Sequence, residues 1–242
     1  MKFFLVKILL VLLASSLAVP VCASPFSVTP VRIYMTPKDK AIAVTITNEG
    51  DDELVMQADI YSWKQKPNGE DDLVLTEDLL LSPPIIKLAG KSRQVVRLAR
   101  IRPFLQADQL TYRMILREVP EAKPSKGELQ LQIALAFSLP VFITPPKAKY
   151  QLDCTAERVA VDTIRANCEN KGNAYTQLID LALTSLDGNK LASLDKGGYI
   201  LPTVKRNFEI KSADNRIPGG KAKLTVRLDD GTKQNFDVTL TE

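Results

Sequence analysis

Three arginines are the residues best placed for chemistry in this 242-residue chain. Arg113 and Arg117 flank Ile115 in a run of alternating residues, and the strand period of two puts all three side chains on one face. Arg32 lies in an earlier run of the same kind. A guanidinium group forms bidentate, charge-assisted hydrogen bonds with a carboxylate, so these arginines are candidates for binding an anionic group. The alternative is that they pair with surface acids such as Glu118.

The groups that most enzymes use are missing from the sequence. The chain has no histidine, which removes the commonest general base and a frequent metal ligand. It has no glycine-rich phosphate loop and no CxxC pair. Its acidic clusters at 51–53 and 70–72 lie in polar, turn-like stretches and are interpreted as solvated loops. We therefore expect a binding protein rather than an enzyme, with no cofactor and no metal.

The first 23 residues have the pattern of a secretory signal. Lys2 and Lys7 accompany an apolar run that ends near Val19, and a signal-peptidase site follows at 21–23. We expect cleavage after Ala23; a retained membrane anchor is the alternative, which the short run and its polar residues disfavour. Cleavage leaves 219 residues and lowers the formal net charge from +4 to +2. A nearly neutral chain predicts no nucleic-acid partner.

Two cysteines, Cys154 and Cys168, remain after cleavage. An even pair in an exported protein predicts a disulfide, which would stabilise the fold by about 3 kcal/mol on the chain-entropy estimate. Two free thiols packed as small apolar side chains are the alternative. A metal site is disfavoured because two thiolates without histidine rarely hold zinc.

A stripe of large apolar residues runs along 129–143, with one at every second position. This period indicates a β-strand with one apolar face. At about 3.3 Å per residue the stripe would extend roughly 50 Å, well beyond an ordinary strand of about 5–6 residues. Part of it is therefore expected to serve something other than this protein's own core. Its members are Leu129, Leu131, Ile133, Leu135, Phe137, Leu139, Val141 and Ile143.

Short alternating runs separated by turn residues predict an all-β chain of two β-sandwich domains. Adjacent prolines within 144–147 mark the boundary, because proline donates no hydrogen bond to a sheet. The predicted domains are 24–144 and 145–242. The predicted strands are 26–34, 41–47, 54–63, 72–75, 93–98, 112–119 and 129–143 in the first domain, and 150–154, 163–169, 177–185, 190–192, 199–204, 208–210, 222–228 and 234–240 in the second.

The order and spacing of several segments resemble the periplasmic pilus-assembly chaperones of the chaperone–usher pathway, the PapD-like superfamily. The matching segments are 31–34 with its arginine, 46–48, 57–64 with its tryptophan, 82–90, 95–98, 112–120 and 131–135. The firmest is Leu-Arg-Glu-Val-Pro at 116–120. The second domain matches in length and β character but carries little diagnostic sequence.

The resemblance implies two immunoglobulin-like domains in a boomerang arrangement and a periplasmic location. Such chaperones bind pilin subunits by donor-strand complementation and deliver them to an outer-membrane usher. The striped strand would insert alternate side chains into the subunit, while basic residues hold the subunit's C-terminal carboxylate. We expect Leu139, Val141 and Ile143 to pack in the chaperone itself. The predicted donor residues are Leu129, Leu131, Ile133, Leu135 and Phe137.

One position departs from the pattern of the best-known members. They have a lysine near the end of the striped strand as partner to the early arginine, whereas this chain has Pro140, which carries neither charge nor N–H. Arg113, on the strand expected beside the stripe, is the predicted replacement. We therefore expect Arg113 to be the principal carboxylate anchor, with Arg32 and then Arg117 as lesser candidates. This combination resembles the archaic, Csu-like branch.

Other classes remain open at this point. A secreted adhesive or binding protein of tandem immunoglobulin-like domains would share the strands, the disulfide and the signal. A pilus subunit would also be exported and β-rich, but it would usually have one incomplete domain. Because an exposed apolar strand edge promotes association, the free chaperone is a candidate for self-association through the donor strand.

Overall fold

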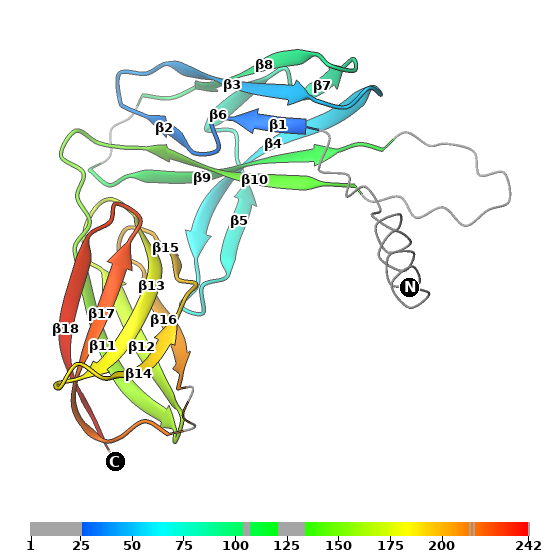
Figure 1. Ribbon diagram of the computed structural model, residues 1–242. Coiled ribbons are helices and arrows are strands. Elements are labelled where there is room, and N and C mark those ends of the chain that lie inside the picture. Colours follow the sequence, from blue (N-terminus) through cyan, green and yellow to red (C-terminus); the bar gives the residue numbers. More distant parts are fainter. Residues whose placement is uncertain (1–25, 104–106, 121–133, 213, 215, 242) are drawn as a thin grey trace, which may run out of the picture.

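The computed structural model describes residues 26–103, 107–120, 134–212, 214 and 216–241, and they form an all-β structure without a helix (Figure 1). No helix long and apolar enough to cross a membrane occurs in these residues. The strands form two immunoglobulin-like β-sandwiches set at an angle to each other, in a boomerang arrangement. The predicted fold class is confirmed.

The N-terminal sandwich consists of two sheets. The first has strand order β1-β3-β8-β6, and the second has order β2-β10-β9-β4-β5, with β7 also paired to β4. Its strands are β1 (Phe26–Thr29), β2 (Ile33–Met35), β3 (Ala41–Asn48), β4 (Leu54–Gln65), β5 (Asp71–Leu75), β6 (Leu79–Ser82), β7 (Ile85–Leu88), β8 (Arg93–Arg100), β9 (Leu110–Glu118) and β10 (Ala136–Ile143).

The C-terminal sandwich likewise has two sheets. One has order β11-β12-β16, and the other has order β14-β13-β17-β18, with β15 also paired to β13. Cys154 and Cys168 are directly opposite each other on β11 and β12 and form a disulfide, as predicted. The strands are β11 (Leu152–Ala160), β12 (Thr163–Asn170), β13 (Thr176–Ser185), β14 (Lys190–Leu194), β15 (Gly198–Ile200), β16 (Lys205–Lys211), β17 (Gly220–Leu228) and β18 (Lys233–Leu240).

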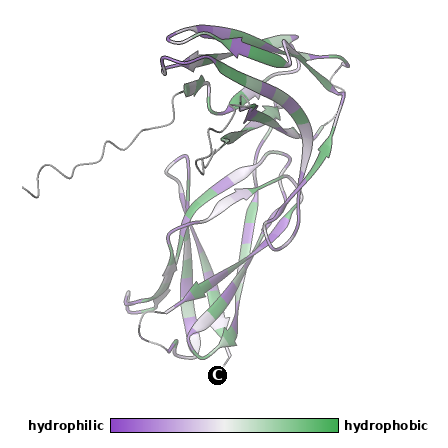
Figure 2. Ribbon diagram, turned by 90° about the vertical axis from the view of Figure 1, so that its right-hand side faces the viewer, coloured by the Kyte–Doolittle hydropathy of each residue, from purple (hydrophilic) through white to green (hydrophobic). Residues whose placement is uncertain are grey.

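Each sandwich buries its own apolar core, as the alternation in the sequence predicts. Along β4 the even-numbered residues Leu54, Met56, Ala58 and Ile60 are buried in the first core. Figure 2 shows this alternation as green and purple segments that follow one another along many strands. Strands with one apolar face are stable only when that face packs against a second sheet, which explains the layered architecture.

The predicted strand 26–34 is wrong as a single element. The chain instead forms β1, which pairs antiparallel with β3, and β2, which pairs parallel with β10 in the other sheet. Pro30 lies between them and has no N–H for a ladder. The runs that became β6 and β7, of four residues each, were not predicted.

The striped segment is described only from residue 134 onward. β10 begins at Ala136, and residues 129–133 lie outside the described part of the chain. Strands of the first sandwich end at Ile143 and those of the second begin at Leu152. We propose that the domain boundary lies after Thr144, with domains 24–144 and 145–242.

Candidate functional site

The outer face of the second sheet carries two of the three predicted anchor residues, Arg113 and Arg117, whereas Arg32 lies in the bend just before β2 and not in a strand as predicted. Pro140 on β10 is directly opposite Arg113 on β9, and Arg113 is opposite Tyr61 on β4. Arg117 lies four residues further along β9, opposite Ala136, so Arg113 and Arg117 share this face, as the strand period predicts. β9 and β10 form the surface of the N-terminal sandwich that is turned toward the C-terminal sandwich (Figure 1).

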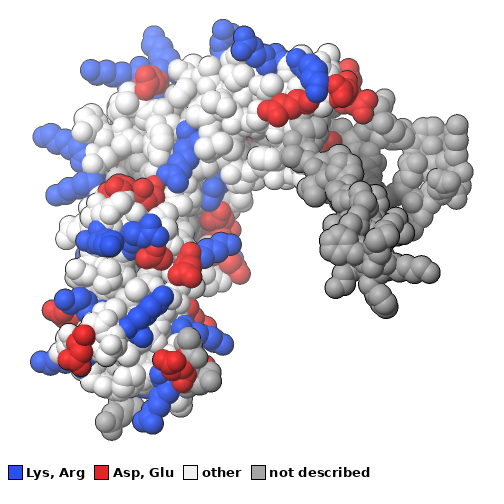
Figure 3. Space-filling view, in the orientation of Figure 1, with Lys and Arg blue, Asp and Glu red and all other residues white. Residues whose placement is uncertain are grey.

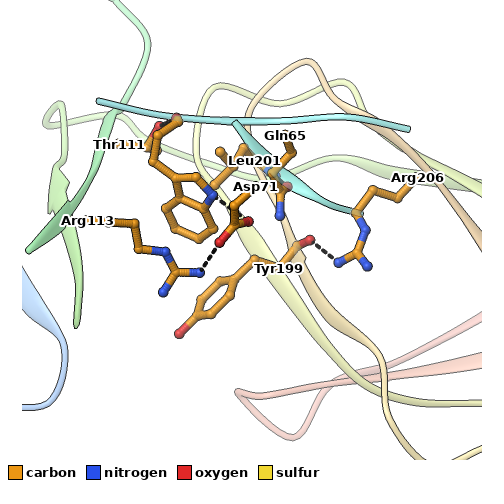
Figure 4. Close-up of polar contacts among 8 residues, drawn as sticks. Gln65, Asp71, Thr111, Arg113, Tyr199, Leu201 and Arg206 are labelled. Atoms are coloured by element: carbon orange, nitrogen blue, oxygen red, sulfur yellow. Dashed lines mark hydrogen bonds and ion pairs between the residues drawn. The ribbon is translucent and has the colours of Figure 1, made fainter. Parts of the chain in front are cut away.

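Arg113 is held by an aromatic face and a carboxylate (Figure 4). Its guanidinium carbon lies 3.6 Å from the ring centroid of Trp63 and 5.5 Å from that of Tyr199. Its Nη2 donates to Asp71 Oδ2 at 3.2 Å, and Trp63 Nε1 donates to Asp71 Oδ1 at 2.7 Å. These contacts fix the guanidinium between the two sandwiches.

Burial affects the charge and hydrogen bonding of Arg113. Its side chain is 13% exposed, and this burial lowers the guanidinium pKa, although the charge of Asp71 opposes the change. Arginine nevertheless stays protonated in proteins. The buried Nε has no hydrogen-bond partner among the described residues. Arg113 is therefore a desolvated cation with donor capacity left for an acceptor.

Arg32 makes an ion pair between the two sandwiches. Its Nη1 donates to Asp229 Oδ2 at 2.7 Å, and nearby the hydroxyls of Tyr34 and Tyr175 are 2.5 Å apart. Burial is the largest single influence on Arg32 and disfavours its charged form, but the hydrogen bonds with Asp229 and Tyr34, together with the nearby tyrosines, outweigh it and raise the pKa. Arg32 thus joins the two domains, a contact that the sequence did not predict.

Arg117 is the most exposed of the three candidates. Its Nη1 donates to Asp59 at 2.5 Å and its Nη2 donates to the Tyr61 hydroxyl at 3.1 Å. The hydrogen bond with Tyr61 raises the guanidinium pKa despite partial desolvation. The acid suggested by the sequence, Glu118, instead accepts a hydrogen bond from the Leu135 N–H at 3.3 Å. Each candidate arginine therefore pairs with an aspartate, but not with the predicted acid.

The interpretation of 70–72 as a solvated loop is wrong for Asp71, whereas the strand predicted over 72–75 already included Asp72. Asp71 begins β5 and pairs with Gln65 on β4, while Asp72 pairs with Lys64. The side chain of Asp71 is turned into the site between Trp63 and Arg113 (Figure 4). The local polar sequence resembles a loop, and only strand pairing brings the carboxylate to the site.

A group of aromatic and aliphatic side chains, hereafter the junction cluster, joins the two sandwiches. Phe142 stacks on Tyr175 with ring centroids 4.0 Å apart, and Trp63 meets Tyr199 edge-on at 5.3 Å. Trp63, Phe142 and Leu201 are buried here, outside both sandwich cores. The sequence analysis missed this cluster. The one local indication of the cluster in the sequence was Phe142, a large apolar residue at a position between the apolar residues of the stripe.

The β4–β5 hairpin extends from the first sandwich to the second (Figure 1). Its tip accepts hydrogen bonds from the second sandwich: the Leu201 N–H donates to Gln65 Oε1 at 3.0 Å, and the Asn207 N–H donates to the Pro67 carbonyl at 2.9 Å. Gly69 has φ 87° and lies against Arg206, so a side chain there would clash. The hairpin carries Trp63 and Asp71 and therefore positions half of the site.

The stripe is divided between buried and half-buried residues. Leu139, Val141 and Ile143 are at most 5% exposed in the first core, which confirms that they pack in the protein itself. Leu135 and Phe137 are only partly buried at the margin of that core, and the Phe137 ring lies 4.7 Å from Phe26. Leu129, Leu131 and Ile133 lie outside the described residues.

Among the described residues, one edge of β10 has no partner strand along half of its length. β9 pairs with β10 over its whole length, whereas β2 pairs only with Val141–Ile143. Among the described residues, no strand pairs with the other edge at 136–139. Such an edge presents unpaired backbone groups that can bind another strand.

The direction of these backbone groups follows from two hydrogen bonds. The Glu118 N–H on β9 donates to the Leu135 carbonyl at 2.8 Å, and the Thr144 N–H donates to the carbonyl of Met35, the last residue of β2, at 2.8 Å. Because backbone groups alternate along a strand, odd-numbered residues of β10 bond to β9 and even-numbered residues face the other edge. Ser138 therefore directs its N–H to the open edge, and Pro140 costs no hydrogen bond with β9.

Comparison with known families identifies the class of protein. The family model described as "Pili and flagellar-assembly chaperone, PapD N-terminal domain" matches residues 25–149. The chain belongs to this family of pilus-assembly chaperones. This membership disfavours the alternative of a secreted adhesive protein. No curated protein sequence matches the chain.

Solved structures with the same fold cover almost the whole chain. A chain from the CsuC–CsuE chaperone–tip adhesion subunit complex of archaic Csu pili from Acinetobacter baumannii has a TM-score of 0.65 at 20% identity, covering 90% of this chain and 100% of that chain. The E. coli chaperone DraB has a TM-score of 0.57 at 20% identity, covering 89% of this chain and 96% of that chain. The SafA pilin–SafB chaperone complex of Salmonella enterica gives 0.58 at 14% identity, with coverages of 91% and 99%. At these identities the likeness shows a common fold.

Proposed function

We propose that this chaperone binds pilin subunits in the periplasm by donor-strand complementation and delivers them to an outer-membrane usher. The observation that carries the proposal is the open edge of β10, beside the half-buried side chains of Leu135 and Phe137. Strand addition needs both features, because backbone hydrogen bonds give affinity and alternate side chains fill pockets in the partner.

The proposed donor residues continue the stripe away from the core. They are Leu129, Leu131, Ile133, Leu135 and Phe137. Burial of one such side chain in a subunit groove contributes about 1.5–3 kcal/mol, so several together make a stable complex without covalent chemistry. Phe137 already contacts Phe26, and it would therefore form the border between the chaperone core and the subunit.

Arg113 is the proposed principal anchor for the subunit's C-terminal carboxylate. It is the most desolvated of the three arginines, and Asp71 is the one hydrogen-bond acceptor of its guanidinium among the described residues, which leaves other N–H donors for a subunit carboxylate. It also lies opposite Pro140, at the end of the open edge. Arg32 and Arg117 are proposed as lesser contributors, because Arg32 holds Asp229 across the domain junction and Arg117 is exposed.

The relatives of known structure support this proposal. CsuC–CsuE and SafA–SafB are complexes of a chaperone with a tip subunit or a pilin. The Csu pili in the first of these are archaic, which agrees with assignment of this chain to the archaic branch. Delivery to an usher and residence in the periplasm after cleavage at Ala23 complete the proposal and follow from the pathway that the sequence resembles.

Substitution of Ser138 by proline tests the donor edge. Ser138→Pro removes one N–H from the open edge while leaving the hydrogen bonds between β10 and β9 intact. We expect loss of capture when the variant is co-expressed with the pilins encoded beside its gene, measured as soluble, co-purifying pilin. The matched control is Ser138→Ala, which keeps the N–H and should capture pilin like the wild type.

The test separates strand addition from other modes of binding. Thermal unfolding of the isolated variants confirms that both remain folded. If folded Ser138→Pro captures pilin as well as Ser138→Ala does, the open edge of β10 is not the binding strand. A soluble pilin that co-purifies with neither the wild type nor Ser138→Ala would contradict the chaperone–pilin pairing itself.

A further inference from the structure

The three proposed anchor arginines share an arrangement that the sequence did not predict. Each pairs with its own aspartate: Arg113 with Asp71, Arg32 with Asp229 and Arg117 with Asp59. Figure 3 likewise shows basic and acidic side chains interspersed around the junction of the sandwiches, with no continuous basic surface on the face in view. A site built only to attract a carboxylate would leave its cations unneutralised.

Asp71 is the aspartate that acts on the principal anchor. It accepts from Trp63 Nε1 at 2.7 Å as well as from Arg113 at 3.2 Å, and its backbone is held in β5 opposite Gln65. Its side chain is 33% exposed, so solvent screens its charge only in part. The shorter bond to Trp63 keeps the carboxylate in place when a second acceptor approaches Arg113.

A subunit carboxylate at Arg113 would therefore share one guanidinium with Asp71. Two carboxylates within a few ångströms repel each other, and in a partly buried site this repulsion can exceed a factor of ten in an equilibrium constant. The other guanidinium donors of Arg113 still favour binding, because Asp71 is the one hydrogen-bond acceptor of this side chain among the described residues. Arg113 paired with Asp71 therefore binds a carboxylate less tightly than an unpaired guanidinium would.

We propose that Asp71 is a specificity-determining residue that limits the strength of the carboxylate anchor. The proposal rests on the function proposed for Arg113. A carboxylate alone binds weakly at this site, and only one attached to a strand that pairs with β10 is held firmly. Release at the usher is then controlled by exchange of the strand, because loss of the strand leaves a weak ionic contact.

The experiment measures binding of a simple carboxylate to the full mature chain. The probe is sodium acetate, titrated at constant ionic strength against sodium chloride, with acetamide as the neutral analogue. Trp63 is the one tryptophan of the chain, so its indole N–H resonance reports on this site alone, together with the Nε–H of Arg113. We expect Asp71→Asn to lower the dissociation constant for acetate about tenfold and to leave acetamide without effect.

Matched variants separate this effect from a general change of charge. Asp59→Asn removes the same charge beside Arg117 and should leave the acetate affinity at Trp63 unchanged. Asp71→Ala is the second variant, expected to strengthen acetate binding as Asp71→Asn does; it also serves if the asparagine variant misfolds. Thermal unfolding monitors the fold of each. An Asp71 variant with equal or weaker affinity, or an equal gain in Asp59→Asn, overturns the proposal.

Arg113→Gln distinguishes failure of this inference from failure of the proposed anchor. If acetate perturbs the wild-type site and this response disappears in Arg113→Gln, the anchor is supported, and the Asp71 variants then decide the inference alone. If acetate produces no response in either the wild type or Asp71→Asn, or the same response in the wild type and in Arg113→Gln, Arg113 is not a carboxylate site. Both proposals then fail together.

Discussion

Removal of the Phe142 side chain should uncouple the two sandwiches. The ring is fully buried, stacks on Tyr175 at 4.0 Å and lies 6.0 Å from both Trp63 and Tyr199. A buried Phe→Ala substitution costs about 3–5 kcal/mol, and each aromatic pair accounts for about 0.5–1.5 kcal/mol beyond its buried area. Because two of these partners belong to the second sandwich, much of the loss in Phe142→Ala falls on the junction between the domains.

Denaturant unfolding followed by two probes measures this loss of coupling. Fluorescence of Trp63 reports on the junction, and far-ultraviolet circular dichroism reports on the sheets of both domains. We expect coincident transitions in the wild type, whereas in Phe142→Ala the Trp63 transition should precede the loss of sheet structure.

The matched control is Leu116→Ala, a truncation inside the first core on the neighbouring strand β9. Leu116→Ala should lower the free energy of unfolding by about 2–5 kcal/mol and shift the transitions seen by both probes together. Two results would refute the assignment of the junction cluster as the link between the domains. One is coincident transitions in Phe142→Ala, and the other is a decrease in its free energy of unfolding below about 1 kcal/mol.

Two further predictions concern stability. Replacement of Cys154 and Cys168 by serine should lower the free energy of unfolding by about 3 kcal/mol, because the disulfide closes a loop of 14 residues in sequence separation; unchanged denaturant midpoints would contradict this. Burial, and then the charge of Asp78, raises the pKa of Tyr112, so the folded state holds the phenolic proton more tightly than the unfolded state. The resulting stabilisation is complete below a pH of about 10 and is lost above it. Between about pH 10 and 12 the denaturant midpoint of Tyr112→Phe should therefore decline less steeply than that of the wild type. An identical decline in both proteins would show that Tyr112 is not the source of this pH dependence.

Local periodicity accounts for most of the strands that were predicted correctly. β3, β4, β8 and β9 agree with the predicted runs to within two residues at each end. Their side chains alternate between core and solvent, and this alternation can be recognised from residues that are close in sequence. The split of 26–34 could not be predicted, because the choice of sheet depends on β3 and β10, which are distant in sequence.

The candidate site was predicted less completely than the fold. The shared face of Arg113 and Arg117 follows from the strand period, and the position of Arg113 opposite Pro140 agrees with the predicted neighbouring strand. The role of Asp71 was missed because its surroundings in sequence are those of a polar turn. Whether Arg113 binds a subunit carboxylate stays a prediction.

The sequence by itself determined the two-sandwich architecture, the cysteine pair and the apolar stripe, because each depends on the alternation or spacing of nearby residues. Only the tertiary structure decided what surrounds the arginines. Asp71 is 42 residues from Arg113 and Asp229 is 197 residues from Arg32, so no local pattern links them. The same holds for the open edge of β10, since an edge is free or covered according to which distant strand pairs with it.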